Sequence, residues 1–338
     1  MEHELTWGLP VILYLFLAGL GAGAVTVSAA ILLRTGEYHG GSYFKLARYG
    51  ALIGPIPVIL GTCFIILELG RWDRAFNLYK VINLSPMSIG SWLLALFIIC
   101  SLLYALVFLP SFLPRFERLS RRIFPIMHTL SWVNVPLGIG VAVYTGILLG
   151  AMPSRPLWNS PILAMLFLVS ALSTGIAVII LAQTLSHLVH GKDPTVKTER
   201  RSSEHYQEAP LSSLGHRNYE ISYLLTGSDM LLIIIELIVI FLFVMFAHLT
   251  VGNLKYAMAI ILPGGEMAGM FWGWVVLVGL LIPGLMEMFY IIPKVVYGRE
   301  FRIHEGSEVM ISVAVLVGGF MLRYIVVVAG QVTGPLGL

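Results

Sequence analysis

Four ionisable side chains lie within stretches that are otherwise apolar: Glu68, Glu236, Glu287 and Arg323. A charge at membrane depth is costly, so such residues are functional candidates by default. A carboxyl group can take up and release a proton, which makes Glu68, Glu236 and Glu287 candidates for proton transfer. Arg323 stays protonated and is a candidate for orienting carboxylates or a bound polar group. A hydrogen bond to a neighbouring helix is the alternative role for Glu236, and a place at the membrane interface is the alternative for Glu287.

A polar segment over residues 68–92 separates two apolar stretches. It reads Glu68-Leu-Gly-Arg71-Trp72-Asp73-Arg74 and, further on, Leu84-Ser-Pro86-Met-Ser88-Ile-Gly90-Ser-Trp92. A plain connection between two membrane helices does not need this density of Arg, Asp and Trp. The segment therefore indicates that the protein works at one membrane face. The residues expected to dock a partner and close a site are Arg71, Trp72, Asp73 and Arg74.

Two tyrosines place hydroxyl groups inside apolar stretches. Tyr14 lies within the first stretch and Tyr144 near the end of the fourth. A buried tyrosine offers a flat ring and one hydroxyl that needs a partner. A quinone head group, which is a flat ring with carbonyl acceptors, would suit such a side chain. Anchoring in the aromatic belt at the membrane surface is the alternative for each of them.

The cysteines and histidines favour no metal site in this protein. Cys63 and Cys100 form no CxxC pair, so no iron–sulfur, zinc or disulfide site is predicted. A haem b needs paired histidines on facing helices at similar depth. His128, His187 and His190 lie at one set of helix ends and His248 at the opposite end of its helix, so no haem is predicted.

The glycine-rich run Gly19-Leu-Gly21-Ala-Gly23 lies in the middle of an apolar stretch. It does not follow a strand, so it does not indicate nucleotide binding. Gly19 and Gly23 instead form the GxxxG spacing that allows two membrane helices to pack closely.

The elements that position these residues are membrane helices. Of the 338 residues, 58% are hydrophobic and 12% are charged, against about 25% charged in soluble domains. Eight stretches are long enough to cross a hydrocarbon core of about 30 Å, and they predict an all-α membrane protein with eight transmembrane helices. The stretches are 8–33, 45–69, 88–109, 125–149, 160–188, 229–249, 267–291 and 308–329.

The distribution of basic residues predicts the orientation. Fifteen of the 21 Lys and Arg residues fall in one set of loops and five in the other. Since cytoplasmic loops carry the excess of Lys and Arg, both termini and the 71–91 loop are expected to be extracytoplasmic. The hydrophilic loop 191–228 is predicted to be a linker between a five-helix bundle (residues 1–190) and a three-helix bundle (residues 229–338).

Four motifs, in order along the sequence, resemble the NrfD/polysulfide reductase membrane-subunit family. The first is Tyr14-Leu-Phe-Leu-Ala-Gly19-Leu-Gly-Ala-Gly23. The second is Leu67-Glu68-Leu-Gly70-Arg71 followed by Ser85-Pro-Met-Ser88 and Gly90-Ser-Trp92. The third is Tyr144-Thr-Gly146 followed by Arg155-Pro-Leu-Trp158-Asn159, and the fourth is Leu322-Arg323 followed by Ala329-Gly330-Gln331.

This resemblance implies a quinone-reactive membrane subunit of a respiratory oxidoreductase complex, in the cytoplasmic membrane of a bacterium or archaeon. Such a subunit carries no cofactor of its own and binds a quinone, such as menaquinone, as substrate. It implies a ferredoxin-like partner with [4Fe–4S] clusters on the extracytoplasmic face and a molybdopterin catalytic subunit, and no nucleic-acid partner. The implied quinone-binding residues are Tyr14, Tyr144, Arg155, Trp158 and Gln331.

The sequence departs from the family pattern in the first helix. Tyr144 stands where the polysulfide reductase member has its quinone-binding Tyr. Tyr14 replaces a His of that site, and Val11 replaces an Asn. Tyr14 can donate a hydrogen bond, but Val11 cannot.

Two other classes of function stay open from the residues alone. A proton- or ion-coupled transporter would use Glu68, Glu236 and Arg323, although the sequence has no internal repeat of the kind that many transporters show. A haem-bearing quinol anchor is the third class.

Overall fold

The computed structural model describes residues 7–36, 42–68, 85–111, 113–190, 212–249, 252–298 and 303–334. Every regular element within these ranges is a helix. Eight of the described helical stretches are long and apolar enough to cross a membrane, which confirms the predicted all-α membrane fold. They are Leu9–Thr35, Tyr43–Glu68, Pro86–Ser111, Pro114–Gly150, Pro161–Val189, Ser222–Phe246, Ala268–Tyr297 and Glu305–Val332.

The first half of the described sequence holds α1 to α9. Its elements are α1 (Leu9–Thr35), α2 (Ser42–Ile53), α3 (Pro55–Glu68), α6 (Pro86–Phe108), the 3₁₀ turns η1 (Leu109–Ser111) and η2 (Pro114–Phe116), α7 (Glu117–Ile123), η3 (Phe124–Ile126), α8 (Met127–Gly150) and α9 (Pro161–His190). The second half holds α11 (Ser212–Leu249), α12 (Asn253–Met258), α13 (Ala268–Met270), the π-helix η5 (Phe271–Leu281), α14 (Ile282–Tyr297) and α15 (Glu305–Val332).

Local sequence explains several helix ends. The Ser-Pro-Met-Ser turn begins α6, because Ser85 is its N-cap and accepts a hydrogen bond from the Ser88 backbone N–H, while Pro86 occupies the first turn. Gly36 ends α1 in the left-handed region, at a φ of 63°, where glycine is tolerated best. The second span changes from α2 to α3 at Gly54-Pro55, since proline cannot continue the helical hydrogen bonding.

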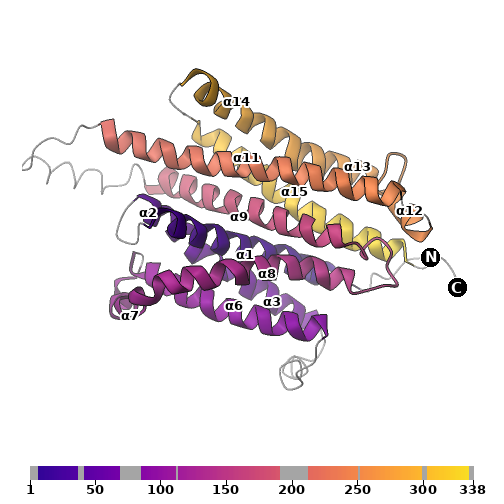
Figure 1. Ribbon diagram of the computed structural model, residues 1–338, viewed down its shortest axis with the longest axis horizontal. Helices are drawn as coiled ribbons and strands as arrows, with labels where there is room; N and C mark the ends of the chain where they lie inside the picture. Colours follow the sequence, from indigo (N-terminus) through magenta and orange to yellow (C-terminus); the bar gives the residue numbers. More distant parts are fainter. Residues whose placement is uncertain are drawn as a thin grey trace, which may run out of the picture.

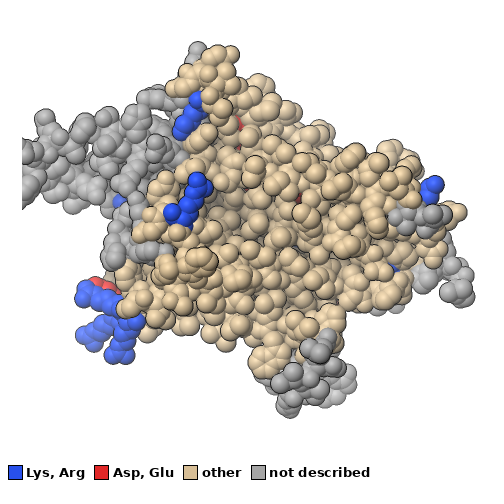
Figure 2. Space-filling view, viewed as in Figure 1, with Lys and Arg blue, Asp and Glu red and all other residues tan. Residues whose placement is uncertain are grey.

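The bundle has two chemically different ends. The start of α1 and the end of α15 lie at one end, which we call the terminal end, whereas α7 lies at the other (Figure 1). Figure 2 shows Lys and Arg side chains gathered at the α7 end, which we call the basic end, with Lys and Arg much sparser at the terminal end. The basic end carries Arg34, Lys45, Arg48, Arg115, Arg118, Arg121, Arg122 and Lys294.

Helix α9 lies in the middle of the bundle (Figure 1). It packs against α1 and α8 on one side and against α11 and α15 on the other. The contact with α1 is a backbone contact: a Cβ added at Gly23 would overlap the carbonyl of Ala171, and a Cβ added at Gly175 would overlap the backbone of Gly23. The predicted use of Gly23 in close helix packing is therefore confirmed.

The second half of the protein joins the first without a break in packing. One hydrophobic cluster contains residues of α1, α8 and α9 together with residues of α11, η5 and α15. The predicted division into five and three helices is therefore not confirmed. Helix α11 begins at Ser212, ahead of the predicted start at 229, so part of the predicted linker is helical. Its membrane-spanning part begins at Ser222, because Tyr223, Leu224 and Leu225 extend the apolar run.

We predict that Gly23→Leu destabilises the bundle, because the new side chain meets a backbone carbonyl that cannot rotate away. Overpacking of this kind costs about 1–3 kcal/mol or more. The measurement is the temperature at which half of the detergent-purified protein remains monodisperse. Gly273→Leu is the matched control, since a Cβ there meets no atom within 4 Å. Equal midpoints for the two variants would contradict the packing account.

Candidate functional site

At the terminal end, four residues from distant parts of the sequence form a cluster that we call the terminal clamp: Trp7, Arg155, Trp158 and Gln331. The Gln331 side chain accepts a hydrogen bond from the Trp7 backbone N–H (2.8 Å) and donates one to the Trp7 carbonyl (3.0 Å). The Trp7 and Trp158 rings stack with centroids 5.1 Å apart. The clamp thus joins the entry to α1, the α8–α9 connection and the end of α15.

Trp158 is held as a structural side chain. Its ring is buried, and its indole N–H donates to the Val326 carbonyl of α15 (2.8 Å). A Cβ added at Gly330 would overlap this ring, so α15 needs glycine there. Trp158 therefore presents only the edge of a ring that is fixed in place. Its one hydrogen-bond donor is already bound to the Val326 carbonyl.

Arg155 brings a cation to the same place. It donates to the Gln331 backbone carbonyl (2.5 Å), and its guanidinium carbon lies 6.0 Å from the centre of the Trp158 ring. A guanidinium has five N–H donors, so this contact leaves donors for a bound acceptor. The backbone of Gly334 lies against the guanidinium, where a Cβ would overlap it.

The clamp borders a cavity of about 230 Å³ lined by Trp7, Met152, Ser154, Arg155, Trp158 and Gln331. Pockets for drug-sized ligands are larger, at roughly 300–1,000 Å³. The cavity therefore suits a single ring system, with a cation and two indole rings in its wall. Three of the five predicted quinone-binding residues come together here.

The other two predicted residues lie deeper in the helices. Tyr144 of α8 and Tyr14 of α1 stand roughly 8–9 Å from the terminal end of their helices, at 1.5 Å per residue. Tyr144 is 8% exposed, and its ring lies directly on the backbone of Gly90 in α6, where a Cβ would overlap it. Tyr14 is 1% exposed, and its backbone packs against Gly61 of α3.

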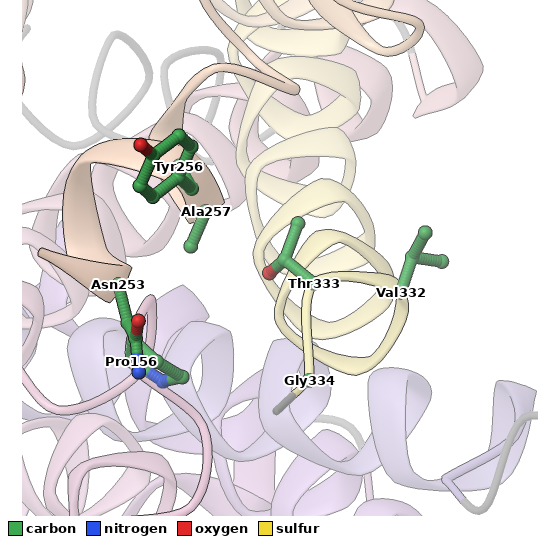
Figure 3. A pocket seen from close by; sticks show the side chains of 7 residues that line it. All are labelled: Pro156, Asn253, Tyr256, Ala257, Val332, Thr333 and Gly334. Carbon is green, nitrogen blue, oxygen red and sulfur yellow. The ribbon is translucent and has the colours of Figure 1, made fainter. Parts of the chain in front are cut away.

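A second, smaller cavity of about 130 Å³ opens at the terminal end between α12 and α15 (Figure 3). Asn253 and Tyr256 of α12 stand across from Thr333, which directly follows α15, with Pro156 of the α8–α9 connection beside Asn253. Tyr256 is 71% exposed. This cavity widens the polar surface next to the clamp.

Arg323 lies inside the bundle, without exposed surface. It donates to the Ser170 hydroxyl and to the Gly319 carbonyl, both at 2.8 Å. Its guanidinium also lies 5.2 Å from the centre of the Phe167 ring. Gly19 leaves room for it, since a Cβ there would be 3.1 Å from Nη2. Arg323 thus contacts α1, α9 and α15, and its predicted orienting role stays a prediction.

One buried carboxyl group, that of Glu236, lies near this arginine, and two more are buried on α11 and α14. Glu236 is 3% exposed and lies within hydrogen-bonding reach of the Ser170 hydroxyl that Arg323 contacts. Glu287 is 1% exposed and lies beside Asp229, which is fully buried. The interface position considered for Glu287 is therefore wrong. Glu68, in contrast, is exposed at the end of α3, with a carboxylate oxygen close to Gly8.

Two residues of these sites were missed from the sequence. Trp7 lies just ahead of the first predicted helix, and only its stacking with Trp158 reveals its role. Asp229 is the first residue after the predicted linker, and its spacing of two helical turns from Glu236 is the signal in the sequence for one shared buried face. Arg71, Trp72, Asp73 and Arg74 lie outside the described residues.

Within the described part of the protein, no three His, Cys, Asp or Glu side chains gather as a metal site. The chemistry that the terminal end offers is hydrogen bonding and ring stacking, next to a cation.

Comparison with known proteins gives a match over nearly the whole sequence. The family model for polysulphide reductase, NrfD, matches residues 1–199 and 216–335. A protein NrfD homolog of Haemophilus influenzae is 30% identical, over 98% of this protein and 96% of its own length. Protein NrfD of Escherichia coli is 29% identical, over 98% and 96%. A polypeptide of the polysulfide reductase of Wolinella succinogenes is 28% identical, over 97% and 95%.

We predict that Gln331→Leu loosens the terminal clamp, because the Trp7 backbone loses one acceptor and one donor. The loss of about 1.4 kcal/mol of local stability corresponds to roughly tenfold faster amide exchange at Trp7. Hydrogen exchange with mass spectrometry measures it on the peptide that contains Trp7. Thr333→Val is the control, since that hydroxyl bonds only within its own helix, to the Ala329 carbonyl. Unchanged exchange at Trp7 in Gln331→Leu would refute the clamp.

Proposed function

The protein belongs to the polysulphide reductase NrfD family, and from this premise we propose that it is the quinone-reactive membrane subunit of a respiratory reductase complex. In this proposal it passes electrons between the membrane quinone pool and an iron–sulfur partner docked at the terminal end. One observation carries the proposal: Arg155, Trp158 and Gln331 border a ring-sized cavity at the same end of the bundle as Tyr14 and Tyr144.

The chemistry of a quinone fits these side chains. Reduction of a quinone to a quinol takes two electrons and two protons, and the two carbonyl oxygens gain negative charge as the electrons arrive. A guanidinium and a tyrosine hydroxyl are both donors to such an oxygen. We assign Arg155 to hold one carbonyl and Tyr144 to donate to the other as the ring enters, with Tyr14 closing the site from α1. The partly exposed Trp7 ring of the clamp would stack on the quinone, with the Trp158 ring behind it.

The fixed position of Tyr144 supports its assignment. Its ring rests on the backbone of Gly90, just after the turn that begins α6. The preceding segment, residues 69–84, contains the docking candidates Arg71, Trp72, Asp73 and Arg74. A partner bound to that segment would therefore sit next to α6 and the site. Glu68, exposed at the end of α3, is the residue that we propose exchanges protons with the aqueous phase there.

The orientation is part of the proposal. The basic end would face the cytoplasm, by the excess of Lys and Arg in cytoplasmic loops, and the terminal end would be extracytoplasmic. Electrons would then enter or leave on the outer face through a ferredoxin-like subunit, with a molybdopterin catalytic subunit beyond it. The polysulfide reductase polypeptide among the relatives supports a place in a reductase complex.

We predict that Tyr144→Phe lowers kcat/KM for quinol-linked turnover about tenfold, because the substrate loses one hydrogen bond of about 1.4 kcal/mol. The complex is expected to assemble normally, since the ring on Gly90 is kept. The measurement is turnover of the purified complex with a short-chain quinol.

Tyr104→Phe is the matched control. Tyr104 is also a buried tyrosine, but its hydroxyl pairs with Ser28 in the half of the bundle nearer the basic end. Normal turnover in Tyr144→Phe, or equal losses in both variants, would contradict the assignment of Tyr144.

A further inference from the structure

A group of exposed arginines lies in the short segment that connects α6 to α8 at the basic end. We call it the arginine patch, and its members are Arg115, Arg118, Arg121 and Arg122. Glu117 is the one acidic residue within this segment, and it pairs with Arg121 (2.6 Å). The segment therefore presents an excess of three positive charges at the membrane surface.

Helix α7 is fixed to the bundle by the side that faces away from the arginines. Ser120 is buried and donates to the Val107 carbonyl of α6 (2.9 Å). Arg118 and Arg122 are four residues apart and share one side of α7, whereas Ser120 lies two residues from each of them, on the opposite side. The patch is therefore held facing outward, and Figure 2 shows its Lys and Arg side chains projecting at the lower left, where Figure 1 places α7.

Three of the four arginines have no partner within the described part of the protein. Arg115, Arg118 and Arg122 make no hydrogen bond or ion pair with a described residue. Each guanidinium keeps five N–H donors for an acceptor from outside the protein. Because the planar guanidinium matches phosphate oxygens with two parallel hydrogen bonds, phosphate is the group that this patch fits best.

The length of the fourth span places the patch at the level of the lipid headgroups. The span covers 37 residues, from Pro114 to Gly150, which is about 55 Å at 1.5 Å per residue. A hydrocarbon core of about 30 Å takes up roughly 20 of these residues. Since Gly150 lies at the terminal end, the residues left over are those at the start of the span, which include the patch.

Exposed apolar side chains alternate with the arginines. Leu113, Phe116 and Leu119 are between 37% and 48% exposed, although they lie in the most strongly charged segment that the structure describes. At a membrane surface such a mixture is favourable, because apolar side chains enter the boundary of the acyl chains while long cationic side chains reach the headgroups. The mixture thus fits a lipid better than a free anion, which offers nothing to the apolar groups.

Trp132 continues this surface towards the hydrocarbon core. It is 60% exposed and lies five residues after the start of α8 at Met127, which is about 7.5 Å along the helix. Its indole N–H has no acceptor among the residues that the structure describes. Tryptophan prefers the boundary between headgroups and hydrocarbon, where the ring is in apolar surroundings and the N–H meets polar groups. The acyl chains of a lipid held by the arginine patch would pass this ring.

We propose that the arginine patch, together with Leu119 and Trp132, is a binding site for an anionic phospholipid of the leaflet at the basic end. Charge selects the lipid: a zwitterionic headgroup brings a cation beside its phosphate, which the arginines repel, and phosphatidylglycerol does not. The site lies at the opposite end of the bundle from the terminal clamp. It is therefore independent of the quinone assignment.

The first test measures the affinity for lipid by native mass spectrometry of the detergent-purified protein, titrated with phosphatidylglycerol or with phosphatidylcholine of the same acyl chains. Each cation near an anionic surface contributes a factor of about five. We therefore expect the double variant Arg118→Gln with Arg122→Gln to bind phosphatidylglycerol at least tenfold more weakly, with unchanged binding of phosphatidylcholine.

The double variant Arg34→Gln with Lys45→Gln is the matched control, because it removes two exposed cations of the same end from α1 and α2. Equal losses of affinity in the two double variants, or equal affinity of the wild-type protein for the two lipids, would overturn the proposal.

Free phosphate is the other source of the same headgroup chemistry, and the same titration distinguishes it. Inorganic phosphate and chloride are added at equal ionic strength. We expect both salts to weaken phosphatidylglycerol binding equally, because they only screen the charges. Selective displacement of the lipid by inorganic phosphate would show a site for a soluble anion and would overturn the assignment to lipid.

The second test locates the bound lipid. Bromine on an acyl chain quenches the fluorescence of an indole that it touches, so the protein is placed in mixed vesicles in which either phosphatidylglycerol or phosphatidylcholine is brominated. The contribution of Trp132 is the difference between wild type and Trp132→Phe. At equal mole fractions, we expect brominated phosphatidylglycerol to quench this contribution at least twofold more strongly.

Trp274 provides the control for this test. It is 48% exposed in η5, away from the arginine patch, and its contribution is obtained with Trp274→Phe. We expect the two brominated lipids to quench Trp274 equally. Equal quenching of Trp132 by the two lipids would contradict an anionic lipid site at α7.

Discussion

The burial of Arg323 is the constraint on which the interior of this membrane protein depends. A guanidinium in a bilayer interior must find acceptors within the protein, because lipid offers none. Arg323 finds them on its own helix and on α9, at Gly319 and Ser170. It needs the glycine at position 19 of α1 for space. It also places a positive charge near the carboxyl group of Glu236 in α11. Elements from both halves of the bundle are thereby fixed relative to one another by one cation.

Two groups of side chains with different chemistry lie at different depths along the membrane normal. Aromatic rings gather around the Arg155 cation at the terminal end, where Trp7, Trp158 and Gln331 hold distant segments together. Buried carboxyl groups gather nearer the basic end, at the face of α9 that carries Ser170 and Ser173.

The spans and the family could be predicted from the sequence, because hydropathy over about 20 residues and the order of four motifs are local signals. Hydropathy placed the sixth helix too late, since the polar residues before Asp229 hide an apolar run that begins at Ser222. Tyr144 and Arg155 could be named from motifs alone. The backbone of Gly90 under the Tyr144 ring and the pairing of Asp229 with Glu287 could not, because both are contacts between distant segments. Helix periodicity predicts which side chains share one face of a helix, but it does not predict which neighbouring helix packs against that face.

The measurement that tests the central claim most directly is photoaffinity labelling of the assembled complex with an azidoquinone, followed by mapping of the labelled peptides. The account predicts adducts at the terminal end, in the start of α1, the end of α8 and the segment 152–158, with competition by unlabelled quinol. Adducts confined to the basic end, over residues 115–128, would contradict the location of the quinone site.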